Sequence, residues 1–393
     1  MDKVFKLYVS GREQYTRSAS LILPASIYEM ADVLEQVGSE KVEELYFEIE
    51  KCYRGKFLVD VLENSITLPE LNILAWKISE MEESQEAVLE GLVKMEAQRT
   101  EKGQLPYLKL LQLTENTDCC HLVYEARSDR QLGRFYAENG LVEGVDNLPD
   151  KLFELLDFEK IGRKTRLAED GVFTEDDGYV VRHTELRELT KIPNLEFHSP
   201  FYTLLLELRL ADYENGPILQ LELPTTEEHI RELEEKIPLD EHIIRCTDCA
   251  IPFFCGCVGE KEMTLHDLNE FARMMDFALA RGELAKYKAI LLVTGCRDAA
   301  QAAELGKQRS MAEYRFLPYQ GENGPEEYAT DWLKKKLGQD AALVPDRSLK
   351  ELGRRLMERD HVVETNYGSI QRIDGQPIQR FDLEQEQGFA MTM

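Results

Sequence analysis

Long hydrophobic runs are missing from this sequence. No apolar stretch in the 393 residues approaches the roughly 18 residues needed to cross a bilayer. The first six residues also lack the apolar segment of a secretory signal. We therefore expect a cytoplasmic protein without a membrane partner.

The sequence also lacks a recognisable catalytic motif. It contains no Walker loop, dinucleotide-binding glycine pattern, nucleophile elbow or zincin helix. Its seven histidines are scattered and do not recur at matching positions in the two halves. The paired acids Glu82 and Glu83, like Asp176 and Asp177, are sequence neighbours whose side chains are expected to point apart. These absences predict a protein that is not an enzyme and needs no cofactor.

Positive charge is in short supply. The chain has 47 Lys and Arg against 74 Asp and Glu, which gives a net charge of −27 at pH 7. Residues 1–200 hold 39 acids and 24 bases, and the remainder hold 35 and 23, so the surplus belongs to both halves. Such a field repels nucleic acid and anionic lipid and attracts basic surfaces. Solubility alone also explains an acidic surface, so composition leaves both interpretations open.

Four of the eight cysteines lie close together in the sequence, at Cys246, Cys249, Cys255 and Cys257. The first two have the spacing of a zinc knuckle, whereas the one-residue spacing of the last two is tight for a tetrahedral site. The first half has only Cys52 near the corresponding place. We expect no metal and reduced thiols, with structural zinc on the four cysteines as the alternative.

One nine-residue pattern occurs twice. Thr67–Ala75 reads TLPELNILA, and Thr264–Ala272, 197 residues later, reads TLHDLNEFA. Each copy predicts a helix start, with the threonine as N-cap and an acid three residues on that can reach back to it. The leucines and the final alanine share one helical face. A helix start that recurs at this separation indicates a duplicated chain.

The segments around this pattern recur in the same order. Each half is expected to contain two strands, a helix, a third strand, two helices, a fourth strand, an amphipathic helix and a closing hairpin with a glycine. Capping boxes are expected at Ser26 with Glu29 and at Thr225 with Glu228. We predict an α+β fold, an elongated tandem repeat of small α/β subdomains with short antiparallel sheets and helices.

The predicted boundaries follow from the repeat. They are residues 1–189 for the first repeat, 190–199 for a linker, 200–375 for a second, diverged repeat and 376–393 for a loosely ordered tail. Within the first repeat, residues 1–62 are expected to be rich in strands, 63–104 helical and 105–189 mixed. The tail is rich in glutamine and lacks periodicity.

The first repeat contains a helix pattern at Leu132–Gly140, then Leu152–Arg163 and the hairpin Gly171–Val181. In order and spacing these segments resemble the C-terminal part of ArdA-type antirestriction proteins. In that family a helix of the form A-x-x-Y-x-x-E-x-G precedes Y-I-D-Y-x-x-Y-G-R-D and a final hairpin. The strand Phe5–Val9 and the helix Leu71–Ala75 resemble that family's first strand and its L-N-x-L-A helix. The resemblance covers roughly residues 3–183.

The second repeat departs further from the family pattern. It keeps the leucine, asparagine and alanine of Leu268–Ala272 and the segment Leu352–Arg355, but lacks the Asp-Phe-Glu-Lys stretch that precedes Gly162 in the first repeat. Family members are mostly single copies, so the length of this chain is also a departure.

The resemblance implies a DNA mimic. ArdA-type proteins are elongated, acidic, non-enzymatic dimers of small α+β domains, encoded on mobile genetic elements. They occupy the DNA-binding groove of type I restriction–modification enzymes. It thus implies an inhibitor in the cytoplasm of a bacterial host, with that groove as partner and with no nucleic acid bound. The tandem chain would be a pseudo-dimer within one chain, or a homodimer of tandem chains would form a longer mimic.

Because B-DNA carries one charge per ~1.7 Å of its axis, a mimic needs carboxylates spread over a long surface. The candidates are Glu80, Glu82, Glu83, Glu86, Glu90, Glu169, Asp170, Glu175, Asp176, Asp177, Glu227, Glu228, Glu232, Glu234, Glu235, Asp240 and Glu241. Each one alone is also explained as part of a solvated face. Two other functions stay open: an acidic scaffold or inhibitor of another DNA-binding defence or regulatory protein, and a zinc-stabilised regulatory module.

Overall fold

Both copies of the nine-residue pattern begin helices in the computed structural model of the chain. Thr67 precedes α2 (Leu68–Ser79), where the Thr67 N–H donates to Glu70 Oε2 at 2.8 Å and the Glu70 N–H donates to Thr67 Oγ1 at 3.4 Å. Thr264 precedes α10 (Leu265–Ala280), and its Oγ1 accepts a hydrogen bond from the Asp267 N–H at 3.1 Å. Both predicted N-caps are confirmed.

The structure describes residues 2–11, 17–145, 148–189, 191–193, 200–210, 218–236, 242–259, 263–338 and 345–381. Most of the predicted linker and most of the predicted tail lie outside these ranges. The chain divides into two compact units. Unit 1 comprises Met1–Tyr8, Ser20–Ala25 and Phe47–Glu196, and unit 2 comprises Val9–Ala19, Ser26–Tyr46 and Phe197–Met393.

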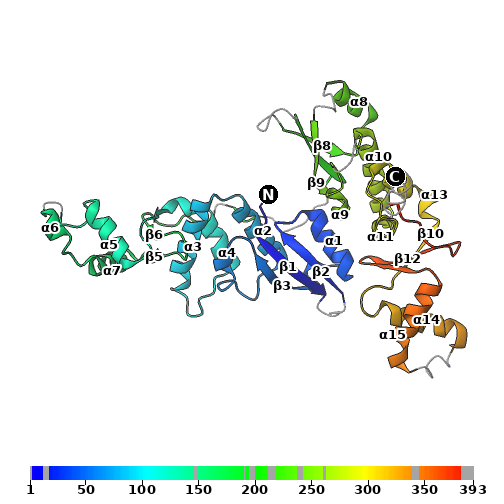
Figure 1. Cartoon of the computed structure of the whole chain (residues 1–393), viewed down its shortest axis with the longest axis horizontal. Helices are drawn as coiled ribbons and strands as arrows, with labels where there is room; N and C mark the ends of the chain where they lie inside the picture. Colours follow the sequence, from blue (N-terminus) through cyan, green and yellow to red (C-terminus); the bar gives the residue numbers. More distant parts are fainter. Residues whose placement is uncertain are drawn as a thin grey trace, which may run out of the picture. The chain divides into compact units, whose positions relative to one another are not determined.

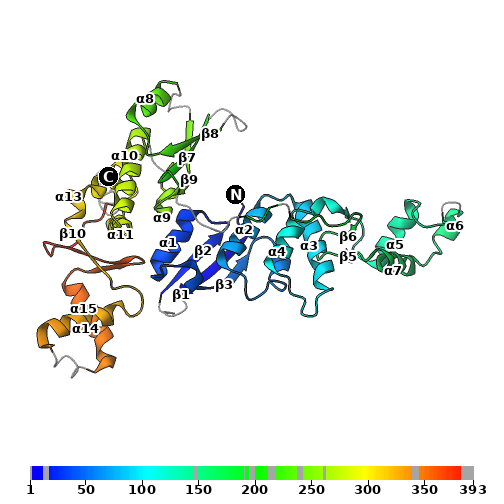
Figure 2. The same cartoon turned by 180° about the vertical axis from the view of Figure 1, so that it is seen from behind.

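The elements drawn from blue to green-cyan in Figures 1 and 2 come from the first half of the chain. Besides α2 they are β1 (Phe5–Gly11), β2 (Ser18–Leu23), α1 (Ile27–Val37), β3 (Leu45–Cys52), α3 (Glu83–Ala97), α4 (Tyr107–Thr114), β4 (Cys120–Val123), α5 (Asp129–Glu138), α6 (Asp150–Phe153), α7 (Phe158–Glu169), β5 (Val172–Phe173) and β6 (Tyr179–Arg182). Three short 3₁₀ turns lie at Val42–Glu44, Lys56–Leu58 and Thr117–Cys119.

The second half repeats this order with two additional short helices before its fourth strand and, among the described residues, without a counterpart of α6. Besides α10 its elements are β7 (Leu204–Leu210), β8 (Ile218–Leu223), α8 (Glu227–Lys236), β9 (His242–Cys249), α9 (Pro252–Cys255), α11 (Leu284–Thr294), α12 (Ala299–Gly306), α13 (Gln308–Met311), β10 (Tyr314–Leu317), α14 (Gly324–Leu337), α15 (Asp346–Arg359), β11 (Val363–Thr365) and β12 (Gly368–Arg372). None of the described helices is long and apolar enough to cross a membrane.

Four small three-stranded sheets are present among the described residues. Two have their earliest strand in the middle, in the orders β2-β1-β3 and β8-β7-β9, and two have their latest strand in the middle, in the orders β4-β6-β5 and β10-β12-β11. The β4–β6 register runs from Cys120↔Arg182 to Val123↔Tyr179, and β10–β12 runs from Tyr314↔Arg372 to Leu317↔Ser369. Both pairs are antiparallel. The predicted α+β class with short antiparallel sheets is confirmed.

The asparagine of the repeated pattern has a structural role that local sequence did not reveal. Buried Asn72 accepts a hydrogen bond from the Ala25 N–H at 2.7 Å and donates to the Ala25 carbonyl at 2.9 Å. Buried Asn269 makes the same pair of bonds to Thr225, at 2.8 and 3.1 Å. Each asparagine therefore fixes the residue that follows the Leu-Pro end of a strand, and satisfies backbone groups that water no longer reaches.

One predicted helix N-cap lies one residue later in the structure than in the prediction. The Ser26–Glu29 capping box is present, with hydrogen bonds of 3.1 and 2.8 Å. In the second repeat Thr226 Oγ1 accepts the hydrogen bond, from the His229 N–H at 3.3 Å. The predicted cap at Thr225 is wrong by one residue, since the backbone of Thr225 is held by Asn269 instead.

Helix pairs in each repeat approach so closely that glycine is required. In unit 1, α5 and α7 pack together, and a Cβ on Gly133 would lie 1.8 Å from the Phe158 carbonyl oxygen. A Cβ on Gly162 would lie 1.8 Å from the Asp129 carbonyl oxygen. In unit 2, α14 and α15 pack in the same way, with Gly353 against Pro325. Gly162 and Gly353 are each followed by an arginine, at the end of Leu152–Arg163 in the first repeat and within Leu352–Arg355 in the second.

The main core of unit 2 includes a helix from the first half of the chain. Leu204, Leu206 and Leu208 alternate along β7 and pack with α10 residues such as Phe271. Tyr28 of α1 belongs to the same cluster, and its hydroxyl donates to the backbone carbonyl of Tyr202. The helix α1 is thus bound into the unit that contains the second repeat.

A buried lysine adds a polar contact to this packing. Lys288 of α11 has only 1% of its side chain exposed, and its Nζ lies 2.6 Å from Asp32 Oδ1 and 2.7 Å from Glu35 Oε2 of α1. The Tyr367 hydroxyl donates to Asp32 Oδ1 at 2.9 Å. Burial outweighs the attraction of Lys288 and raises the pKa of the Glu35 carboxyl. One cation thus serves two acids in a site shielded from water.

We predict that Lys288→Met strongly destabilises unit 2, because it leaves two acids near each other without a buried counter-charge. Loss of one partner of a buried ion pair typically lowers the free energy of unfolding by about 3–5 kcal/mol. Chemical denaturation followed by fluorescence measures the change. Lys286→Met, on the same helix but only half-buried, is the matched control. Equal effects of the two substitutions would contradict the structural role of Lys288.

Candidate functional site

Three predicted acids gather where α2 ends and α3 begins. Glu80 is the C-cap residue of α2, and Glu82 and Glu83 stand at the start of α3. All three are exposed. The backbone between them is held by Arg54, whose Nη2 donates to the Met81 carbonyl at 2.7 Å. We call Glu80, Glu82 and Glu83 the α2–α3 corner, an exposed group of carboxylates on hydrogen-bonded backbone.

The next two predicted acids, on α3, face the interior of unit 1. Glu86 accepts hydrogen bonds from Arg54 Nε at 2.8 Å and from the Gly55 N–H at 2.7 Å. Glu90 is 8% exposed, pairs with Lys94 at 2.6 Å and accepts from the Glu175 N–H at 2.7 Å. Their charges are used inside the fold, so the prediction of an exposed surface is wrong for Glu86 and Glu90.

Two acids at the end of α7 also have partners in unit 1. Glu169 Oε2 accepts hydrogen bonds from the Tyr136 hydroxyl at 2.8 Å and from the Tyr179 hydroxyl at 3.2 Å. Burial, together with this carboxylate, raises the pKa of Tyr136. Asp170 lies 2.5 Å from Arg99 and adopts a left-handed φ of 55° that ends the helix. Both acids are exposed, and their partners Tyr136, Tyr179 and Arg99 lie within unit 1.

The turn between β5 and β6 presents a second exposed group. Glu175 and Asp176 are exposed and Asp177 is half-buried. Glu175 lies 3.9 Å from Lys56, a loose surface pair, and the Asp177 N–H donates to Thr174 Oγ1 at 3.1 Å. Because the backbone of the turn is hydrogen-bonded, the fold fixes where these side chains leave the chain. We call Glu175, Asp176 and Asp177 the β5–β6 turn.

The α8 helix of unit 2 holds the third group. Glu227 is engaged, since it lies 2.9 Å from Arg273 and 3.0 Å from His266. Against the raising effect of burial, hydrogen bonds from His266 and Asn269 lower the pKa of Glu227. The remaining acids are the α8 group: Glu228, Glu232 and Glu235 are exposed and Glu234 is half-buried. Asp240 and Glu241, also predicted, lie outside the described residues.

The four clustered cysteines lie in and after β9. Cys246 Sγ is 2.7 Å from Cys255 Sγ, and Cys249 Sγ lies 3.7 Å from Met275 Sδ in the core. Hydrogen bonds with Cys249 and Cys255, together with burial, raise the pKa of the Cys246 thiol. Within the part of the chain that the structure describes, no group of three or more His, Cys, Asp or Glu side chains is arranged to hold a metal ion. Metal analysis of the purified protein decides the zinc alternative for Cys246, Cys249, Cys255 and Cys257.

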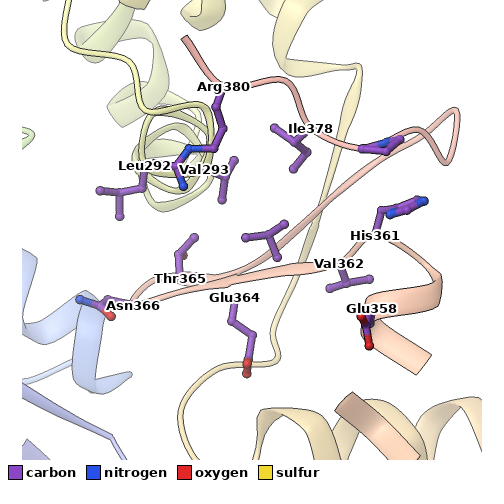
Figure 3. Close-up of a pocket in the computed structure, with 12 residues that line it drawn as sticks. Leu292, Val293, Glu358, His361, Val362, Glu364, Thr365, Asn366, Ile378 and Arg380 are labelled. Carbon is purple, nitrogen blue, oxygen red and sulfur yellow. The ribbon is translucent and has the colours of Figure 1, made fainter. Parts of the chain in front are cut away.

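A cavity of about 580 Å³ in unit 2 lies among α11, β11 and residues 377–380. Figure 3 shows Leu292 and Val293 on one side of it and Glu358 and His361 on the other, with Ile378 and Arg380 above β11. Glu364 points away from Arg380 (Figure 3). The polar side chains come from separate edges of the cavity, whereas a ligand site usually has a few polar groups that converge. We assign no function to it.

The chain matches no protein-family model, and a search of curated proteins gives no match.

We predict that removal of divalent metal leaves the protein folded. Cys249 Sγ lies against Met275 and Cys246 Sγ against Cys255 Sγ, and no three described His, Cys, Asp or Glu side chains are arranged to hold an ion, so we expect a chelator to extract none. Melting temperatures before and after dialysis against EDTA, with zinc analysis of the undialysed protein, measure this. One zinc per chain and a melting temperature lowered by EDTA would overturn the prediction.

Proposed function

We propose that this protein is a DNA mimic that inhibits type I restriction–modification enzymes by occupying their DNA-binding groove. The observation that carries the proposal is the presence of exposed carboxylates on hydrogen-bonded backbone, at the α2–α3 corner, the β5–β6 turn and the α8 group. The target class comes from the resemblance of residues 3–183 to ArdA-type proteins. The net charge of −27 supplies the long-range attraction to a basic groove.

The position of Glu80 favours an interaction surface over simple solubility. Glu80 caps the C-terminus of α2, where the helix dipole disfavours an acid by about 0.3–1 kcal/mol. Glu82 and Glu83 add like charges close by, although at the start of α3 the helix dipole favours these two acids. Solubility alone could be obtained at positions without this local penalty, whereas a protein that imitates a row of phosphates must tolerate neighbouring negative charges.

The binding energy in this proposal is spread over many weak contacts. An exposed ion pair contributes about 0.2–1 kcal/mol, so one carboxylate adds little. Several together supply useful affinity, and salt weakens all of them at once because it screens exposed charges. The acids that the fold uses internally, Glu86, Glu90 and Glu227, are left out of the proposed surface.

Cleavage of DNA by a purified type I enzyme, titrated with this protein, tests the proposal. We expect inhibition that weakens as salt rises and is relieved by added duplex DNA. Glu83→Gln alone should raise the half-inhibitory concentration less than about fivefold, since one exposed pair is worth at most about 1 kcal/mol. Joint replacement of Glu80, Glu82, Glu83, Asp176, Glu228 and Glu235 by their amides should raise it at least about sevenfold, as roughly 1.2–6 kcal/mol is lost.

A control variant separates position from net charge. It replaces six exposed acids outside the three groups by glutamine, namely Glu101, Glu125, Glu143, Glu188, Glu322 and Glu327. We expect it to inhibit nearly as well as the unaltered chain. Equal loss of inhibition in both sextuple variants would show that net charge alone causes the effect. If the unaltered chain inhibits none of several type I enzymes, the proposal is excluded. Capture of a different basic protein from a host lysate would then favour the acidic-scaffold alternative.

A further inference from the structure

Two thiols of unit 2 lie side by side, apart from the three acidic groups. Cys246 belongs to β9 and Cys255 is the last residue of α9, and their Sγ atoms are 2.7 Å apart. Both residues are free cysteines. A disulfide joins its two sulfurs at about 2.05 Å, so a small movement of one side chain brings this pair to bonding distance.

The two cysteines are attached to parts of the core of unit 2. Cys246 lies opposite Leu206 of β7 in the sheet. Cys255 follows Phe254, which is fully buried and has its ring centroid 4.4 Å from that of Phe271. Because the backbone on both sides is anchored by core packing, the fold itself places the two sulfurs next to each other.

The two thiols differ in their exposure to solvent. Cys255 is half-buried, whereas Cys246 is only 7% exposed. Cys246 donates its S–H to the Asp248 carbonyl at 3.4 Å, and Cys255 donates its own to the Cys246 sulfur. Hydrogen bonds with Cys249 and Cys255, together with burial, raise the pKa of the Cys246 thiol. A reagent from solvent therefore reacts first at Cys255, since the thiolate is the reactive form and Cys246 keeps its proton.

The first repeat has no thiol at either position. The residues 197 positions earlier are Ile49 and Leu58. The same displacement relates the two N-cap threonines and aligns β3 with β9, with Cys52 at the end of one strand and Cys249 at the end of the other. Apolar side chains occupy both positions in the first repeat, so packing alone does not call for a pair of thiols in the second.

We propose that Cys246 and Cys255 form a site of reversible oxidation by hydrogen peroxide, which joins β9 to α9 by a disulfide. In the first step the Cys255 thiolate attacks one peroxide oxygen. A sulfur–oxygen bond forms, the oxygen–oxygen bond breaks, and the released hydroxide takes up the thiol proton to become water. The product at Cys255 is a sulfenic acid.

In the second step the Cys246 sulfur attacks the sulfur of Cys255. The sulfur–sulfur bond forms, the sulfur–oxygen bond breaks, and hydroxide leaves with the Cys246 proton as a second water. Two thiols have then lost two electrons and two protons, and the peroxide has gained them. A thiol reductant restores both cysteines by thiol–disulfide exchange.

The bond ties the short segment that carries Phe254 to the strand from which it departs. In a reducing environment the pair stays as two thiols, and peroxide closes the bond, so this site reports oxidation. The proposal does not depend on the proposed function, because the bond is measured on this chain alone.

Peptide mapping of the full chain after exposure to hydrogen peroxide tests the proposal. The protein is first treated with EDTA, so that no metal shields the thiols, and the remaining thiols are alkylated after the reaction. Cleavage by chymotrypsin after Phe254 and by endoproteinase Asp-N before Asp248 places Cys246, Cys249 and Cys255 in three different peptides. We expect the peptides of Cys246 and Cys255 to be joined, and dithiothreitol to separate them.

Three variants assign the roles of the sulfurs. Cys255→Ser should abolish the bond and slow the loss of the Cys246 thiol at least about tenfold, because the more exposed thiol is gone. Cys246→Ala should halt the reaction at the sulfenic acid of Cys255, which dimedone traps. Cys257→Ser should leave the bond intact. Thermal melting of each variant, followed by circular dichroism, verifies that it is folded.

Cys52 is the matched control. It is half-buried like Cys255, but no hydrogen bond joins its sulfur to another thiol among the described residues. We expect it to remain outside any bond within the chain. The proposal is overturned if peroxide oxidises Cys52 while Cys246 and Cys255 stay thiols, or if Cys246 bonds to Cys249 or Cys257 instead. It is also overturned if dimedone labels Cys255 no more in Cys246→Ala than in the unaltered chain.

Discussion

The ammonium group of Lys288 is the buried charge on which the arrangement of unit 2 depends. It lies between Asp32 and Glu35 of α1, a helix that precedes Lys288 by about 250 residues in the sequence. Isolated charges are strongly disfavoured away from water, so each of these groups needs the others. A cut at residue 190, between the two predicted repeats, would separate Lys288 from both acids and expose the apolar contact of Tyr28 with the second-repeat core. The repeats are duplicated in sequence, yet they do not fold as two independent copies.

The acidic residues divide into two physical classes, and this division matters more than the total charge. Glu86 and Glu90 accept hydrogen bonds inside unit 1, and Glu227 binds Arg273 inside unit 2. Glu80, Glu83 and Asp176 are instead exposed to solvent, on backbone that is hydrogen-bonded to other residues. Only the second class can meet a basic groove without giving up intramolecular contacts. The proposed DNA mimic therefore depends on a subset of its carboxylates.

Local features of this fold could be predicted from sequence, and distant ones could not. The Thr67 and Thr264 caps, the succession of strands and helices along each repeat and the short hairpins follow from patterns a few residues long. The i,i+4 pair of Glu90 and Lys94 was also readable, but such pairs are typical of exposed helix faces and do not reveal that Glu90 is buried. The partners Arg54 of Glu86 and Asp32 of Lys288 lie 32 and 256 residues away, beyond the reach of any local pattern. The hydrogen bonds of Asn72 to Ala25 also could not be predicted, because the repeated pattern showed only that an asparagine recurs there. The unpaired hydroxyl of Tyr107 likewise has no sequence signal.

The most direct test of the account is the equilibrium between this protein, a type I restriction–modification enzyme and a duplex that contains the enzyme's target. Fluorescence anisotropy of the labelled duplex, measured with the enzyme and rising amounts of the protein, reports displacement. The account predicts that the protein displaces the labelled duplex fully. Its apparent affinity for the enzyme should fall in proportion to the concentration of unlabelled duplex, and displacement should weaken at higher salt. A ternary complex in which duplex and protein bind the enzyme together would contradict occupation of the DNA-binding groove.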